Sequence, residues 1–476
     1  MSATAFPTHA NTSQRLPWVL VKISAERALL FTAVALRILV YIFLSPLNND
    51  KEHFDVIKYI AEHHALPPLG AISLAFHPPL YYLLAVPFYW TSPNPKFVQL
   101  LSLIFSLITL CLGYQLLYKT DLIDSKQVRL YVFFFLGFLP QFVLFGLYIS
   151  NDSLAIAVGA LLAVEAWLAT GKNGGLHLLW LSILVGVGLL TKATFLAYLP
   201  VLFVLVLVIQ SGRHRSFGKV FASALALVLL AGCIGSYRYV RNYREAKIPF
   251  VSNLDLGSRW ASDQRVSYRG VASFLDFNLF KLVASPTLSK STASAYPLLL
   301  YGTFWYQHIP ESNFVISRHN PLNYLGSAFY LLGVVPATIA LFGIVMLLKD
   351  SPRILLRFDS SRIEDRRRLV ALANIAFLLG NLAILLAGAA KYHVWSLMQG
   401  RLLFPALWGF LLPFAFGCCY LEATKWPRLG LQLVMNAFFI CTVAYFSWEI
   451  FSHSGAMIVP ASARVHMLSI LKLRSL

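Results

Sequence analysis

Charged residues are scarce in this sequence. Only 12% of the 476 residues are Asp, Glu, Lys or Arg, whereas 58% are hydrophobic. A soluble domain carries about 25% charged residues, so this composition excludes a soluble enzyme or binding module and indicates an integral membrane protein. The sequence also contains no internal repeat, no low-complexity region and no separable soluble domain.

Acidic residues are especially few, with 20 Asp and Glu against 39 Lys and Arg, for a formal net charge of +19. This excess favours anionic headgroups or phosphate-bearing lipids as partners. Nucleic acid is not expected, because there is no basic soluble domain to bind it. The five cysteines all lie in apolar runs. That placement indicates small core residues and excludes a disulfide framework or a zinc pattern.

Long apolar runs dominate the chain. A membrane-spanning helix needs about 20 apolar residues, and the sequence predicts an all-α, polytopic membrane protein of about eleven such helices. The predicted spans are Ala28–Leu44, Phe97–Tyr118, Leu130–Ile149, Leu154–Ala169, Leu176–Leu190, Phe195–Ile209, Val220–Tyr237, Leu322–Leu348, Leu369–Ala387, Leu402–Leu421 and Leu431–Phe451. Two further segments, Asp50–His64 and Pro79–Trp90, are amphipathic or too short to cross, and predict interfacial helices.

The positive charges give the predicted orientation. Short loops rich in Lys and Arg face the cytoplasm, and the strongest such loop is Lys349–Arg368. We therefore expect residues 1–27 to form a cytoplasmic segment, residues 28–451 the transmembrane domain, and residues 452–476 an extracytoplasmic tail. With this orientation the loops that carry Asp50, Asp152, Lys192, Arg241 and Arg401 all lie outside.

The first outer loop carries Asp50, Glu52 and His53. Charge close to lipid is costly, so such a cluster favours a functional role. A carboxylate in this position can act as a general base toward a hydroxyl group. The alternative is structural, since Asn49 and Glu52 have the spacing of a capping box at a helix start.

Other polar residues also allow two interpretations. The His77-Pro78-Pro79-Leu80-Tyr81-Tyr82 segment fits either a site wall or an aromatic belt at headgroup level. Asp152 fits either a second site carboxylate or a helix cap. Lys192, Arg241 and Arg401 stand at outer span ends, where they could bind a lipid phosphate or simply snorkel to the interface.

Together these segments resemble the GT-C glycosyltransferases, including the protein O-mannosyltransferases, the lipid A aminoarabinose transferases and related bacterial enzymes. The segments that carry the resemblance are Asp50-x-x-His53-Phe54, His77–Tyr82, Asn151-Asp152-Ser153-Leu154, Leu190-Thr191-Lys192, Arg238–Asn242 with Pro249-Phe250, and Gln399–Pro405. Lys51 separates Asp50 from Glu52, whereas the commonest form of the first motif has Glu directly after Asp.

The resemblance implies an inverting glycosyltransferase of the bacterial cytoplasmic membrane that uses a polyprenyl-phosphate-linked sugar on the extracytoplasmic face. It implies Asp50 as base, with Asp152 and His53 as further catalytic residues. The expected substrate-binding residues are Glu52, His77, Tyr81, Tyr82, Lys192, Arg241, Gln399 and Arg401. No cofactor is indicated. A requirement for a divalent cation stays open, because no His/Asp spacing is diagnostic. The acceptor is a glycan, lipid or protein hydroxyl. The alternative is a transporter or lipid flippase without transferase activity.

Overall fold

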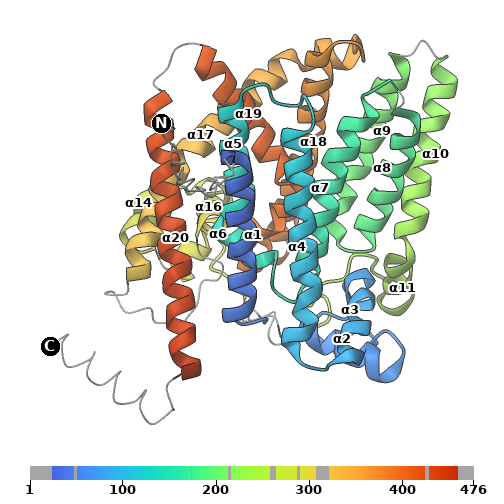
Figure 1. Cartoon of the computed structure of the whole chain (residues 1–476). Coiled ribbons are helices and arrows are strands. Elements are labelled where there is room, and N and C mark those ends of the chain that lie inside the picture. Colours follow the sequence, from blue (N-terminus) through green and yellow to red (C-terminus); the bar gives the residue numbers. More distant parts are fainter. Residues whose placement is uncertain are drawn as a thin grey trace, which may run out of the picture.

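The computed structural model of the chain describes residues 24–47, 51–172, 174–212, 216–257, 264–286, 290–306, 321–423 and 428–458. Every regular element in these ranges is a helix, accompanied by two isolated β-bridges. The all-α prediction is therefore confirmed for this part of the chain. Figure 1 shows the long helices side by side in a bundle, with the short helices α2 (Glu52–His63), α3 (Leu80–Thr91) and α11 (Tyr237–Ala246) at its lower end.

The first half of the chain forms eleven α-helices and one 3₁₀ helix among the described residues. They are α1 (Ala25–Phe43), α2 (Glu52–His63), α3 (Leu80–Thr91), α4 (Pro95–Tyr118), α5 (Lys126–Phe138), α6 (Pro140–Phe145), α7 (Asn151–Ala169), α8 (Gly174–Leu189), η1 (Ala193–Ala197), α9 (Tyr198–Ser211), α10 (Phe217–Gly235) and α11 (Tyr237–Ala246).

Four short helices open the second half, followed by the long helices that complete the bundle. They are α13 (Ala272–Leu275), α14 (Leu279–Ala284), α15 (Lys290–Ala293), α16 (Tyr296–Trp305), α17 (Pro321–Leu356), α18 (Ile363–Tyr392), η2 (Trp395–Met398), η3 (Gly400–Ala406), α19 (Trp408–Ala423) and α20 (Arg428–Ile458).

Seven helices among the described residues are long and apolar enough to cross a membrane, or up to eight if a bent pair counts as one span. The bent pair is η3 with α19, whose axes differ by 75°. The protein is thus an integral membrane protein with several spans, whereas the count of eleven and the orientation remain predictions. The predicted domain limits at residues 27 and 452 also remain predictions.

The predicted span Leu130–Ile149 is two helices, because proline interrupts it. Pro140 has no amide hydrogen, so the carbonyl of Leu136 loses its helical partner. The guanidinium of Arg37, which is fully buried on α1, takes over that role. It donates to the carbonyl oxygens of Leu136 (3.0 Å) and Gly137 (2.8 Å) and to Ser106 Oγ (2.9 Å). This intramembrane charge therefore caps a broken helix.

The lower end of the bundle in Figure 1 carries α2, α3 and α11, and we call it the Asp152 end. The two predicted interfacial helices form there as α2 and α3, with Ile57 and Ile60 on the buried face of α2. The next span starts at a defined cap, where Asn94 Oδ1 accepts from the Lys96 amide (2.8 Å) and Pro95 occupies the first turn.

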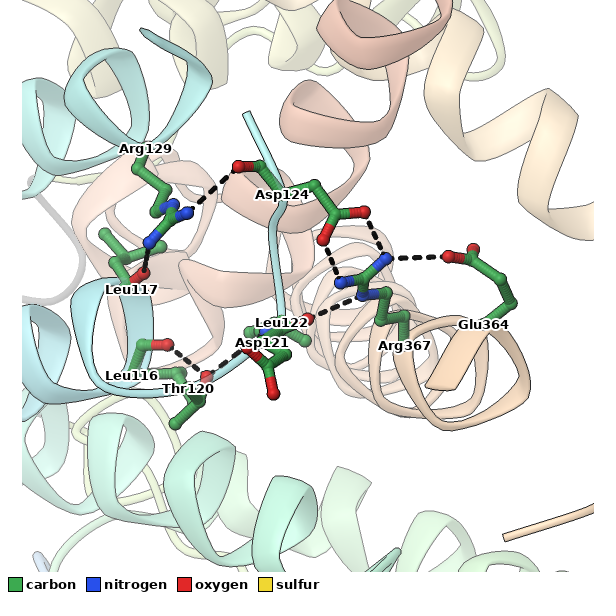
Figure 2. A network of polar contacts seen from close by, with 9 residues as sticks. All are labelled: Leu116, Leu117, Thr120, Asp121, Leu122, Asp124, Arg129, Glu364 and Arg367. Atoms are coloured by element: carbon green, nitrogen blue, oxygen red, sulfur yellow. Dashed lines mark hydrogen bonds and ion pairs between the residues drawn. The ribbon is translucent and has the colours of Figure 1, made fainter. Parts of the chain in front are cut away.

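The opposite end is tied together by Arg367, at the start of α18 (Figure 2). Its guanidinium pairs through two nitrogens with the Asp124 carboxylate, and it also bonds Glu364 (2.7 Å) and the Asp121 carbonyl (2.6 Å). This bidentate ion pair fixes the connection between α4 and α5 against α18. The connection itself is held by Arg129, which donates to the Asp124 carbonyl (2.9 Å).

Candidate active site

Three charged side chains from distant parts of the chain meet at the Asp152 end. Asp152 lies in the first turn of α7 and is 3% exposed. Lys192 Nζ forms an ion pair with Asp152 Oδ1, and Arg401 Nη1 lies 3.8 Å from Asp152 Oδ2. We call these three residues the Asp152 cluster. It shows that the polar segments following α6, α8 and α18 converge, as the predicted topology requires.

Local backbone structure presents each member of this cluster. Ser150 is the N-cap of α7, because its Oγ accepts from the Asp152 amide (3.2 Å), so Asp152 itself is not the cap. Lys192 is in an extended conformation between α8 and η1. Its amide donates to the Gly188 carbonyl (2.7 Å), which fixes the end of α8 against it.

Arg401 is placed by a close approach of two backbones. A Cβ added to Gly400 would lie 2.5 Å from the backbone nitrogen of Phe304. The Gly400 amide donates to Thr303 Oγ1 (2.7 Å). Only glycine fits there, which holds η3 against α16. The Arg401 guanidinium then lies over the Phe145 ring at 4.8 Å, a cation–π contact.

Two histidines lie at the Asp152 end. His53, on α2, is 5% exposed, and its Nδ1 lies 2.9 Å from the Tyr82 hydroxyl. The His53 and His77 rings are 6.0 Å apart. His77 Nδ1 lies 3.4 Å from Asn151 Nδ2, which in turn donates to the Thr191 carbonyl (3.1 Å). The histidines thus connect α2 and α3 to the start of α7.

The pKa of His77 is well below the ordinary value for histidine. Burial is the main cause, and the electrostatic effects of His53 and Lys192 act in the same direction. Asp152 opposes this effect, whereas Arg238 adds to it. His77 is therefore neutral at pH 7 and can both donate and accept a hydrogen bond.

The other predicted site residues occupy different surroundings. Tyr81 is fully buried and its hydroxyl bonds Ser102 Oγ (2.8 Å). Gln399 is 1% exposed, and its Oε1 has no hydrogen-bond partner within the described ranges. Glu52 is partly buried in the first turn of α2. Arg241 is not part of the Asp152 cluster, because it pairs with Glu245 (2.5 Å).

Arg238 belongs to the Arg238–Asn242 motif, but the sequence predicted no site role for it. It is 1% exposed, and its guanidinium donates to the backbone carbonyls of Ala75 and Phe76 (3.2 Å for Nε to Phe76). Asn242, one turn later on α11, also donates to the Phe76 carbonyl (3.3 Å). These bonds hold the segment that carries His77. The i, i+4 spacing of Arg238 and Asn242 could have indicated a shared face.

Asp50 lies outside the described residues. The segments on either side of it are at the Asp152 end, since the Ile149 amide donates to the Pro46 carbonyl (3.0 Å) and His53 contacts His77. The role of Asp50 remains a prediction. The residues that the structure describes contain no group of three or more His, Cys, Asp or Glu side chains that could hold a metal ion.

A long apolar groove begins beside the Asp152 cluster. It has a volume of about 900 Å³ and runs between α9 and α18, with a contribution from the end of α17. Its first wall residue, Ala193, directly follows Lys192, and its wall on α18 extends from Leu369 to Ala387. We call it the α9–α18 groove.

No protein-family model and no curated protein matches this chain. Solved structures that match include ArnT from Cupriavidus metallidurans bound to undecaprenyl phosphate, at 14% identity over 83% of this chain and 78% of that one, with a TM-score of 0.38. The Archaeoglobus fulgidus oligosaccharyltransferase tethered to an acceptor peptide matches at 10% identity over 89% of this chain, with a TM-score of 0.44.

This chain spans about half of the archaeal protein, since the match covers 55% of that chain. At these TM-scores the similarity carries no argument about function. These two solved structures are GT-C membrane glycosyltransferases, the family that the sequence motifs resemble.

Proposed function

We propose that this protein is a membrane glycosyltransferase that moves a sugar from a polyprenyl-phosphate carrier to an acceptor hydroxyl on the outer face of the membrane. One observation supports this most strongly. The Asp152 cluster gathers two cations, Lys192 and Arg401, and Lys192 directly precedes Ala193, the first wall residue of the α9–α18 groove. A cationic head site that continues into an apolar groove suits a phosphate attached to a long hydrocarbon chain.

The dimensions of the groove fit such a chain. From Leu369 to Ala387 its α18 wall rises about 27 Å, at 1.5 Å per residue. The hydrocarbon core of a bilayer is about 30 Å thick. A prenyl chain lying in the groove would therefore stay within the depth of the membrane while its phosphate lies near Lys192.

The proposed reaction is a single displacement. The acceptor oxygen attacks the anomeric carbon of the sugar, and the bond between that carbon and the phosphate oxygen breaks. The acceptor proton passes to Asp50, and polyprenyl phosphate leaves with the electron pair. Lys192 and Arg401 stabilise the negative charge that develops on the leaving phosphate.

The remaining residues have supporting roles in this proposal. Asp152 is already paired with both cations and orients them, which leaves proton abstraction to Asp50. Neutral His77 and the His53–Tyr82 pair can hydrogen-bond the hydroxyls of the sugar. Tyr81, Glu52 and Gln399 complete the walls of the proposed sugar site. Arg238 supports the segment that carries His77.

The structure also bears on the transporter alternative, for which charges deep in the membrane are expected. Arg37 and Glu165 are the two charges deep inside predicted spans. Arg37 has a structural role as a helix cap, and Glu165 is bonded to His177 Nδ1 at 2.7 Å. Neither forms part of the Asp152 cluster, which lies at the end of the bundle, and this favours interfacial chemistry.

The test is lipid analysis of the purified protein by mass spectrometry. Wild type should retain polyprenyl phosphate or its sugar-linked form, and Lys192→Gln should lose it. Lys126→Gln is the matched control, because Lys126 is exposed at the other end of the bundle.

A second pair of variants tests the groove. Ala376→Trp introduces bulk into the groove, whereas Ala383→Trp does so on an exposed position of the same helix outside it. Loss of prenyl lipid only in Ala376→Trp supports the proposal. Equal retention in wild type, Lys192→Gln and Ala376→Trp, or no prenyl lipid in folded wild type, would overturn it.

A further inference from the structure

A second cavity lies at the Asp152 end and is not used by the donor site. It has a volume of about 690 Å³ and is bounded by α2, α3, α10 and α11, with Leu190 after α8. Of these helices, α2, α3 and α11 lie together at the lower end of the bundle in Figure 1. We call it the Arg241 cavity, after the one arginine in its wall.

The wall of this cavity is amphipathic. Ile60, Leu66, Leu83 and Ile234 form much of it, and the polar side chains are those of Arg241, His64 and Tyr237. Among the described residues, no carboxylate lines it. A space with apolar walls and a basic group suits an amphiphile with an anionic head.

Arg241 keeps hydrogen-bonding capacity for such a ligand. Its Nε donates to Glu245 (2.5 Å), and its Nη2 makes long contacts with the carbonyls of Leu66 (3.4 Å) and Pro67 (3.5 Å). No hydrogen bond within the described part of the chain uses Arg241 Nη1. Glu245 therefore orients the guanidinium by one edge and leaves donors on the other.

The Arg241–Glu245 pair stays ionic at neutral pH. Partial burial opposes the charge of Glu245, but the hydrogen bonds from Arg241 and the Leu69 amide outweigh it and lower the pKa of Glu245. Because the pair lies partly in solvent, it is worth little to stability. An anion can therefore compete with Glu245 for Arg241 at low cost.

The cavity is accessible from the membrane and adjoins the Asp152 cluster. Leu83 and Tyr237 are 46% and 54% exposed, so its rim reaches the surface of the bundle. Its inner wall is shared with the site, since the Leu80 amide donates to the Leu190 carbonyl (3.0 Å). Leu190 is two residues before Lys192, and Leu80 is three residues after His77.

From this arrangement we infer that the Arg241 cavity binds the head region of an anionic lipid, and that this lipid is the acceptor of the transfer. The second part depends on the proposed function, whereas the first does not. The inference narrows the acceptor class from any hydroxyl to an anionic amphiphile that enters from the membrane.

Lipid retention tests the binding site without requiring turnover. The protein is exchanged into nanodiscs of equal phosphatidylglycerol and phosphatidylcholine, and retained lipid is measured by native mass spectrometry. Arg241→Gln should lower the retained ratio of phosphatidylglycerol to phosphatidylcholine about tenfold, the scale of a charge-assisted hydrogen bond. Arg244→Gln, which removes the same charge from an exposed position on α11, should leave the ratio unchanged.

Two further variants sharpen this result. Leu83→Trp fills the cavity and should reduce retention, whereas Leu84→Trp adds the same bulk on a neighbouring exposed position outside it. Glu245→Gln releases Arg241 and should raise phosphatidylglycerol retention. Equal effects of Arg241→Gln and Arg244→Gln, or no preference for phosphatidylglycerol in wild type, would overturn the site.

The acceptor role is tested separately. Once transfer is measured, Leu83→Trp should lower kcat/KM for the membrane acceptor and leave the co-purified prenyl lipid unchanged. Unchanged kcat/KM would reject the acceptor role. If instead Lys192→Gln retains prenyl lipid normally, the proposed function fails while the Arg241 result still stands.

Discussion

Replacing Lys192 by methionine tests the pairing at the centre of the Asp152 cluster. The side chains of Lys192 and Asp152 are 8% and 4% exposed, so solvent screens their interaction weakly. Removing one partner of a buried ion pair typically costs about 3–5 kcal/mol, because the other charge stays buried without compensation. Arg401 remains 3.8 Å from the carboxylate, so we expect the lower value, about 3 kcal/mol.

A double-mutant cycle separates this coupling from general damage. Lys192→Met and Asp152→Asn are made singly and together, and the free energy of unfolding is measured by SDS titration in mixed micelles. The double variant should be more stable than the sum of the single losses predicts, by about 1–3 kcal/mol. Strictly additive losses would show that the two side chains do not interact and would refute the cluster.

Three other predictions concern the scaffold. Arg37→Met should destabilise the protein by about 2–4 kcal/mol, measured by the same titration, since it leaves buried carbonyls without a donor; an unchanged midpoint would contradict the capping role. Burial opposes the charge of Asp255, but hydrogen bonds from Tyr392 and others outweigh it and lower the pKa of Asp255. Asp255→Asn should therefore lower the free energy of unfolding above about pH 4. The difference in this free energy between the variant and wild type should shrink as the pH falls below that value. A difference independent of pH would refute a stabilising role of the Asp255 charge. In a cysteine-free background, Ala71→Cys should react with an impermeant thiol reagent in intact cells and Lys119→Cys should not, and the reverse pattern would invert the predicted orientation.

Much of the fold follows from hydropathy. The predicted span Phe97–Tyr118 lies within α4, and Leu154–Ala169 within α7. The helix predicted for residues 50–64 matches α2, because a period-3.6 pattern bounded by Pro67 and Pro68 leaves few alternatives, whereas its place at the membrane interface remains a prediction. These elements are determined locally, by apolar periodicity and by caps.

Helix breaks inside apolar runs were harder to predict. The run Leu130–Ile149 was expected to be one helix, although Pro140 marks the point at which it breaks. The run Leu402–Leu421 was expected to be one span, yet the chain bends by 75° between η3 and α19. Composition gives the length of an apolar run, whereas bends depend on tertiary partners such as Arg37.

The convergence of Asp152, Lys192 and Arg401 was accessible from topology alone, because charge counts placed their loops on one side. Their pairing was not, since sequence does not give side-chain direction. Arg238 and Arg241 illustrate this point, because both belong to one arginine-rich motif. In the structure Arg238 is buried against the His77 segment, and Arg241 faces a separate cavity.

Sugar transfer with Asp50 as base can be measured in a purified system. The most direct measurement follows the conversion of polyprenyl-phosphate-linked sugars to polyprenyl phosphate by purified protein in vesicles made from a native membrane lipid extract, using mass spectrometry. Wild type should convert the donor, and Asp50→Asn should be slower by about a hundred- to ten-thousand-fold. Its unfolding should be unchanged, because Asn and Asp have nearly the same size. A well-folded Asp50→Asn protein that transfers at the wild-type rate would contradict the account.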